Sequence, residues 1–189
     1  MIKKALLLLS CVVTLSACVP AALVVGATAG GAILYDKRGF KTMSNDNHAM
    51  MQATHAIRKA KLTPDKSDVT VTVYNGIGLI VGEVDSTKTK LKIGKVVAKT
   101  SHVRRVYNEV LIAGDGSTLS DVNDAWLAGK VKTHLLLKSG LKSGDIKIVV
   151  QSGRVYLMGV VSKYQASLAV EAARQISGVK KVVKVFEYR

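Results

Sequence analysis

Cys18 is the residue near the start of the chain whose side chain is best placed for covalent chemistry. It follows the small residues Ser16 and Ala17, and these end an apolar run over residues 5–15 that comes after a basic start. This order is typical of a secretory signal peptide. A thiol at the cleavage point can accept a diacylglyceryl group, and the amine that cleavage frees can accept a further acyl chain. We therefore predict a signal peptide over residues 1–17 and lipidation of Cys18.

The segment Leu15-Ser16-Ala17-Cys18 resembles the lipobox that the bacterial lipoprotein signal peptidase recognises. Each buried methylene contributes about 0.8 kcal/mol, so more than one acyl chain would anchor the protein stably. Val19 stands where enteric-type bacteria place an Asp in lipoproteins that stay at the inner membrane. The predicted location is therefore the outer membrane, lipid-anchored and facing the periplasm. Cleavage by the general signal peptidase, which would leave a soluble periplasmic protein, is the alternative.

The net charge favours an anionic partner. The chain carries 28 Lys and Arg against 13 Asp and Glu, a net charge of +15, and removal of Lys3 and Lys4 lowers this by 2 to +13. For an exported protein, phospholipid head groups fit this charge better than nucleic acid does. A merely solvated basic surface is the alternative. No disulfide is expected, because Cys11 leaves with the signal peptide and Cys18 is acylated.

Residues 18–43 are predicted to be the lipidated cysteine and a tether. Residues 19–34 are apolar and rich in small side chains, but these 16 residues are short for a membrane-spanning helix, which needs about 20. Gly26 and Gly30 have the spacing of a helix-pairing motif, of which a single copy is weak evidence. A segment on or near the membrane and a weakly structured spacer are equally consistent with this composition.

The rest of the chain contains two copies of one pattern. In each copy, two alternating apolar runs flank a turn, Asn75-Gly76 in the first and Ser152-Gly153 in the second, offset by 77 residues. Asn-Gly between such runs is a strong signal of a β-hairpin. A helical segment precedes each hairpin, and another helix and a strand follow it. The expected strands are residues 69–74, 77–84 and 106–112, and then 146–151, 154–161 and 182–188.

This order predicts an α+β fold of two tandem domains. Each domain is helix-strand-strand-helix-strand, with a small mixed three-stranded sheet packed against two helices. The first domain is expected over residues 44–113 and the second over residues 121–189, with residues 114–120 as a linker. Domains of this size without disulfides are near the lower limit for an independent core, so packing against each other would stabilise both.

Both copies resemble the BON domain family. The resemblance rests on Asn75-Gly76, Gly82 and the closing Gly178-Val179-Lys180-Lys181-Val182, and most specifically on residues 123–126, 130–131 and 155–159. Two such domains behind a lipobox are similar to the dual-BON outer-membrane lipoproteins associated with cell division and envelope stress. The resemblance implies binding of anionic phospholipid through the second domain and support of outer-membrane integrity. His102 replaces the usual glycine before Val103, although His tolerates positive φ better than most residues.

The helix predicted over residues 121–138 carries two neighbouring stripes. Leu127, Val131 and Leu135 are spaced to pack on the sheet. The second stripe combines an indole, a leucine, a lysine and a threonine, and it suits a membrane interface because indole lies well at head-group level and lysine pairs with phosphate. The predicted residues for binding phosphatidylglycerol or cardiolipin are this stripe and two flanking lysines: Trp126, Lys130, Thr133, Leu137, Lys132 and Lys138.

Two alternatives concern these surfaces. Trp126 could instead belong to the core between the domains, because large aromatic side chains are usually buried; the first copy has His48 or Ala49 near the equivalent place. A run of lysines over residues 88–99 could be a second lipid contact. Because no aromatic residue lies among these lysines, a solvated face is the better interpretation.

The sequence contains no recognisable catalytic or cofactor motif. Residues 76–82 resemble a dinucleotide loop, but the third glycine comes one position late and a strand carries it. His48 and His55 are seven residues apart, too far to share a metal without a third ligand. We predict a non-enzymatic protein without metal, cofactor or nucleic acid. The alternative function is a periplasmic scaffold or chaperone that works with the outer-membrane protein assembly machinery through a free sheet edge; a murein-directed enzyme is the least favoured.

Overall fold

The computed structural model describes residues 39–63, 69–113 and 121–189, and the side chains of the last range from residue 123. The predicted signal peptide, the predicted lipidation site Cys18, most of the tether and the linker lie outside the described residues. No helix in the described ranges is long and apolar enough to cross a membrane.

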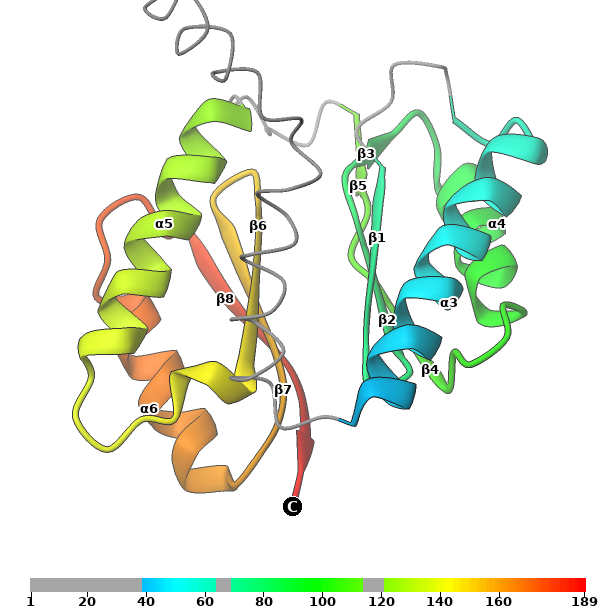
Figure 1. Cartoon of the computed structure of the whole chain (residues 1–189). Coiled ribbons are helices and arrows are strands. Elements are labelled where there is room, and N and C mark those ends of the chain that lie inside the picture. Colours follow the sequence, from blue (N-terminus) through cyan, green and yellow to red (C-terminus); the bar gives the residue numbers. More distant parts are fainter. Residues whose placement is uncertain (1–38, 64–68, 114–120) are drawn as a thin grey trace, which may run out of the picture. The chain divides into compact units, whose positions relative to one another are not determined.

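The first domain is built from residues 39–113 (Figure 1). Its main sheet has the strand order β1-β2-β4, with β1 and β2 antiparallel and β2 and β4 parallel. Two further short strands, β3 and β5, pair in parallel with each other. In the chain, β3 follows β2 and β5 follows β4. The elements are α3 (Phe40–Lys59), β1 (Thr70–Tyr74), β2 (Ile77–Val81), β3 (Glu83–Val84), α4 (Thr87–Ala98), β4 (Arg105–Asn108) and β5 (Leu111–Ile112).

The second domain has the same order of elements, with strand order β6-β7-β8. The first pair is antiparallel and the second is parallel, because helix α6 connects β7 to β8 as a crossover. In Figure 1, α5 and α6 cover one face of this sheet. The elements are α5 (Asp121–Leu137), the 3₁₀ turn η2 (Ser143–Asp145), β6 (Ile146–Gln151), β7 (Arg154–Val161), α6 (Lys163–Arg174) and β8 (Lys181–Tyr188).

These two mixed three-stranded sheets, each with two helices, confirm the predicted α+β fold. The main differences from the sequence interpretation are the start of one helix and the division of two expected strands. Helix α3 begins at Phe40, before residue 44, because the carbonyl of Gly39 accepts hydrogen bonds from the amides of Thr42 and Met43 without a capping side chain. The single strand expected over residues 77–84 is divided, because Gly82 has φ +124°, a conformation that strands do not use. The strand expected over residues 106–112 is divided as well, because β4 pairs with β2 before this break and β5 pairs with β3 after it.

The predicted helix periodicities are confirmed by burial. Ile93 and Val97 of α4 are fully buried, and so are Ala169 and Ala173 of α6. The stripe Leu127, Val131 and Leu135 of α5 is also buried and packs in the core of the second domain. His102 has φ +65° and Gly178, its counterpart, has φ +98°, so the histidine adopts the left-handed conformation of the glycine that it replaces.

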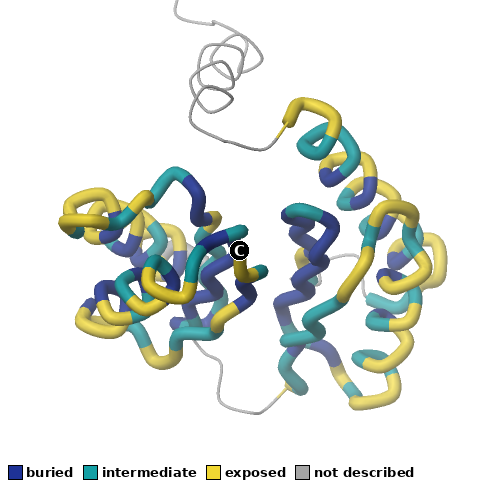
Figure 2. The backbone as a smooth tube through the Cα atoms, turned by 90° about the horizontal axis from the view of Figure 1, so that it is seen from below, coloured by how far each residue is buried: buried dark blue, intermediate teal, exposed yellow. Residues whose placement is uncertain are grey.

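Each domain has a core between its helices and its sheet, and a third apolar cluster joins the two sheets. This cluster contains Leu79 and Val81 of β2, Tyr156 and Met158 of β7, and Val185 of β8, all buried. Successive side chains in a strand point to opposite faces of its sheet. The strands β2 and β7 are therefore buried on both faces, and Figure 2 shows buried positions concentrated in the strands of both domains.

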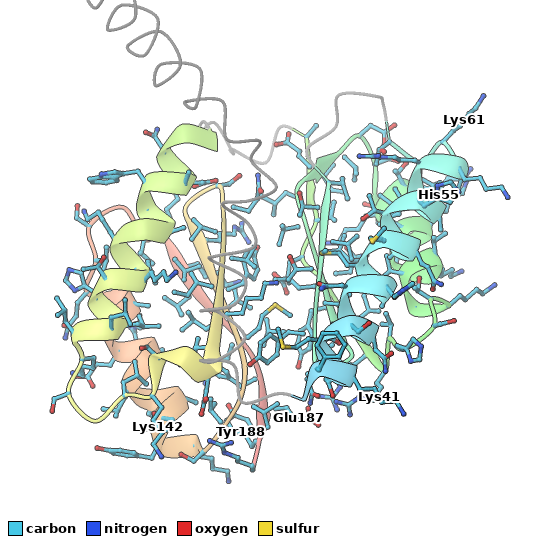
Figure 3. The ribbon with its side chains drawn as sticks, in the orientation of Figure 1. Lys41, His55, Lys61, Lys142, Glu187 and Tyr188 are labelled. Atoms are coloured by element: carbon cyan, nitrogen blue, oxygen red, sulfur yellow. The ribbon has the colours of Figure 1, made fainter. Side chains whose placement is uncertain are left out.

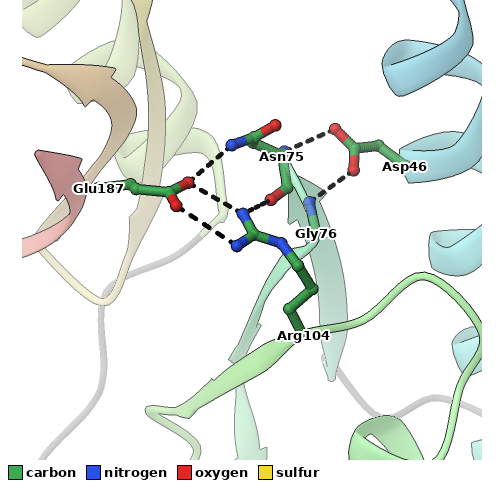
Figure 4. Close-up of polar contacts among 5 residues, drawn as sticks. All are labelled: Asp46, Asn75, Gly76, Arg104 and Glu187. Atoms are coloured by element: carbon green, nitrogen blue, oxygen red, sulfur yellow. Dashed lines mark hydrogen bonds and ion pairs between the residues drawn. The ribbon is translucent and has the colours of Figure 1, made fainter. Parts of the chain in front are cut away.

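A buried aspartate on the first helix of each domain holds the hairpin turn. The Asp46 carboxylate accepts hydrogen bonds from the amides of Asn75 and Gly76, at 2.6 and 2.8 Å (Figure 4). The Asp124 carboxylate does the same for the amides of Ser152 and Gly153. All four turn residues have positive φ, which is typical of a type I′ hairpin turn. Each carboxylate thus ties a helix to the turn of its sheet.

We predict that Asp124→Asn lowers the free energy of unfolding by about 2–3 kcal/mol, because a buried pair of amides loses a charged acceptor. Urea unfolding at pH 7 measures this change. Asp85→Asn is the control, since Asp85 is exposed, and its effect should stay within about 0.5 kcal/mol. Equal unfolding midpoints for the two variants would contradict this role of Asp124.

Candidate functional site

The outer face of α5 exposes large apolar side chains. Trp126 is 64% exposed and Leu137 is 79% exposed, and Leu136 beside it is 56% exposed. The buried stripe Leu127, Val131 and Leu135 occupies the other side of the same helix. Largely exposed leucine and tryptophan side chains in one helix are costly in water, so this face is a candidate contact surface.

A basic side chain completes this apolar face. The Lys130 ammonium lies 4.1 Å from the centroid of the Trp126 ring, which is a cation–π contact. Thr133 is exposed, and its hydroxyl donates to the carbonyl of Gly129 at 3.1 Å. This bond leaves the hydroxyl oxygen available as an acceptor at the surface.

The two flanking lysines differ from each other. Lys132 is exposed. The Lys138 ammonium lies 3.9 Å from the carboxylate of Glu171 on α6, so a neighbouring acid partly offsets its charge. The structure therefore brings Trp126 and Lys130 into contact and directs Lys138 toward α6. Asp124 is the acidic residue among the described side chains of α5. Its carboxylate is buried at the hairpin turn, so it does not repel anions from the outer face of the helix.

Leu136 belongs to this face and was not among the predicted residues. The sequence signal was available, since three consecutive leucines cover about 200° of a helix at 100° each and cannot all face one core. Leu135 takes the buried position and the next two leucines lie in solvent. The alternative placement of Trp126 in the core between the domains is wrong, because strands and not helices form that core.

The positions of α3 that match the predicted lipid-binding stripe of α5 are polar. Asp46 and Asp124 have the same role, so the position that matches Trp126 is His48. The residues that match Lys130, Thr133 and Leu137 are then Gln52, His55 and Lys59, all exposed. His48 and His55 belong to no group of three potential metal ligands within the described residues. The first domain thus lacks the tryptophan and leucine of this stripe, although Phe40 and Met51 of α3 are also exposed.

On α4, Leu91 is 59% exposed among the predicted run of lysines. Lys88, Lys92 and Lys95 around it are also exposed. No aromatic side chain lies in this helix, so its composition still favours a solvated face.

A polar link connects the two domains at the first hairpin turn. The Arg104 guanidinium donates to the Glu187 carboxylate at 2.9 Å and to the carbonyl of Asn75 at 2.7 Å (Figure 4). The Asn75 side-chain amide also donates to Glu187, at 2.6 Å. Together, these donors hold the pKa of Glu187 below its usual range, with Arg104 as the main cause. No sequence signal pointed to this link, because its partners are 83 and 112 residues apart.

Comparison with known proteins agrees with this repeated fold. The family model of the BON domain matches residues 46–114 and again residues 123–189. The chain belongs to the BON-domain family. The resemblance stated from the sequence is therefore confirmed, and the helix-to-turn aspartates Asp46 and Asp124 are the first and second residues of the two matched ranges.

Two relatives cover most of this BON-domain chain. It is 31% identical over 187 residues to the outer membrane lipoprotein DolP of Haemophilus influenzae. This match covers 99% of this chain and 96% of that relative. It is 28% identical over 154 residues to a 21 kDa hemolysin of Actinobacillus pleuropneumoniae, with 81% of this chain and 79% of that relative covered. The first of these similarities extends through both BON domains.

We predict that the link at Glu187 stabilises the folded chain at neutral pH and ceases to do so in acid. A carboxylate with a lowered folded pKa contributes stability above its unfolded pKa, and the contribution is lost as pH falls through the folded value. The advantage of the native chain over Glu187→Gln in urea unfolding should therefore be present at pH 7 and vanish below pH 4.5. Glu171→Gln, which removes an exposed carboxylate, should show little pH-dependent difference. A constant advantage from pH 7 to pH 3 would contradict the link.

Proposed function

We propose that this protein is a non-enzymatic outer-membrane lipoprotein that binds anionic phospholipid through the outer face of α5 and supports envelope integrity. The observation that carries the proposal is the exposed Trp126 in contact with the half-buried Lys130, with two exposed leucines at the end of the same helix. The 31% identity to an outer membrane lipoprotein along almost the whole chain supports the cellular location. The predicted acylation of Cys18 would supply the anchor.

The energetics favour a membrane for this face. Burying a leucine contributes roughly 1.5–3 kcal/mol, and a lysine near an anionic membrane surface contributes about 1 kcal/mol. Leu136 and Leu137 with Lys130 and Lys132 therefore give several kcal/mol, to which the indole of Trp126 adds. This is modest for a free protein. It is sufficient for a tethered one, because the acyl anchor makes the second contact effectively intramolecular.

The arrangement of the side chains matches the layers of a bilayer surface. Leucine enters the acyl region, indole lies at the head-group boundary, and a lysine ammonium reaches the phosphate. The cation–π contact holds Lys130 over the ring, so the charge and the aromatic surface are presented together. A head group that carries a net negative charge gains from both lysines, whereas a zwitterionic one gains little. Phosphatidylglycerol and cardiolipin are the proposed ligands.

We predict that Trp126→Glu and Leu137→Glu each weaken binding to phosphatidylglycerol vesicles by at least about tenfold. Both side chains are exposed, so the unfolding midpoint should change little. Co-sedimentation of the mature, non-acylated chain with vesicles measures the binding, and neutral phosphatidylcholine vesicles give the background.

Tyr164→Glu is the matched control, since Tyr164 is a 67% exposed aromatic residue on α6 of the same domain. It should bind vesicles as the native chain does. Trp126 is the single tryptophan of the chain, so a blue shift of its emission with anionic vesicles reports entry into the interface. Vesicle binding that survives both α5 variants would overturn this site.

A further inference from the structure

A groove lies between α6 and the edge strand β8 in the second domain, away from the outer face of α5. Its volume is about 700 Å³. Helix α6 forms one side of the groove, and strand β8 forms the other. The α6 residues that line the groove are spaced by four, three and four positions. The lining residues that matter here are Lys163, Ser167, Val170, Arg174, Lys184 and Tyr188. Figure 3 labels Tyr188 and its neighbour Glu187 at the end of β8.

Among the described strands, β8 is an edge strand of its sheet, beside this groove. It pairs in parallel with β7 along its whole length, and no other described strand pairs with it. Val183 and Val185 point to the cluster between the sheets, so Lys184 and Tyr188 lie on the helix side of the strand. An edge strand presents unpaired amide and carbonyl groups that accept an additional strand. The groove therefore combines a backbone template with a helix wall, which is a geometry for binding an extended peptide.

The charged side chains at the groove are mostly basic. Lys163, Arg174 and Lys184 are exposed, and none of them forms an ion pair within the described part of the chain. Glu171 is the acidic residue among those that line the groove, and its carboxylate lies 3.9 Å from the Lys138 ammonium. Ala166 is buried and Val170 is partly buried at the base of the groove, so small apolar side chains also fit there.

We propose that this groove binds an extended acidic segment of a partner protein, which adds as a strand beside β8. Side chains alternate along a strand, so acidic residues at every second position of that segment would all face the three cations. Main-chain hydrogen bonds to β8 hold the segment, and the charges select it. A lipid has no backbone that can pair with the free edge, which favours a peptide over a second membrane contact. This proposal does not depend on lipid binding by α5.

The test uses a fluorescein-labelled heptapeptide of alternating Glu and Thr, and anisotropy measured with the mature, non-acylated chain. A peptide of the same composition with its glutamates grouped together is the register control. We expect the alternating peptide to bind more tightly. The double variant Arg174→Glu/Lys184→Glu should weaken that binding at least about tenfold, because it reverses two of the three charges.

Ser167→Trp tests the groove without a charge change, since an indole there occupies the space beside β8. Its matched control is Thr133→Trp on α5; both are exposed hydroxyl residues whose side chains donate to the carbonyl four residues earlier. Only Ser167→Trp should abolish peptide binding. Equal binding of both peptides, or equal loss in both tryptophan variants, would overturn the proposal.

Two other occupants have distinct outcomes in the same experiments. If Ser167→Trp or the double charge variant removes binding to phosphatidylglycerol vesicles, the groove is a membrane contact and the peptide proposal is wrong. If sedimentation shows a dimer of the native chain that Ser167→Trp dissociates, a second copy fills the groove. Retained vesicle binding with lost peptide binding supports the proposal and leaves the α5 site unaffected.

Discussion

The buried carboxylate that binds two turn amides is the interaction on which each domain depends. Asp46 and Asp124 each join the first helix to the hairpin of the same domain. Residues two positions apart on a helix point about 200° apart at 100° per residue. With Asp124 directed to the sheet, Trp126 must face solvent, and it does. The same constraint turns His48 outward in the first domain. One buried hydrogen-bond pair thus decides which helix face each domain displays.

The shared apolar cluster decides which other surfaces remain free. A sheet has two faces, and here helices cover one and the cluster between the sheets covers the other. What remains for partners is the outer side of the helices and the edge of a sheet. The exposed face of α5 and the groove beside β8 are surfaces of these two kinds, and they differ in chemistry. The first is aromatic and aliphatic with lysine, whereas the second is basic with an unpaired strand edge.

The two copies have kept the fold and diverged on the surface. Their hairpin turns, helix caps and core periodicities correspond, and Ser86 and Ser162 cap α4 and α6 in the same way. The α3 positions that match Trp126 and Leu137 of α5 are polar, His48 and Lys59. The glycines that correspond in the two copies, Gly82 and Gly159, have different structural roles. Gly82 divides a strand, while Gly159 stays in β7, where a Cβ atom would come within 2.5 Å of the Asp145 carbonyl.

The sequence alone determined the elements of this protein, because their signals are local. Period-two runs, turn residues and helical spacing predicted two tandem domains, mixed sheets and the buried stripe of α5; the errors were some element ends and the division of two strands in the first domain. The exposure of Trp126, the roles of Asp46 and Asp124 and the link from Arg104 to Glu187 were decided by tertiary structure. Each depends on residues 28 to 83 positions apart, and no local pattern specifies which distant partner a side chain will meet.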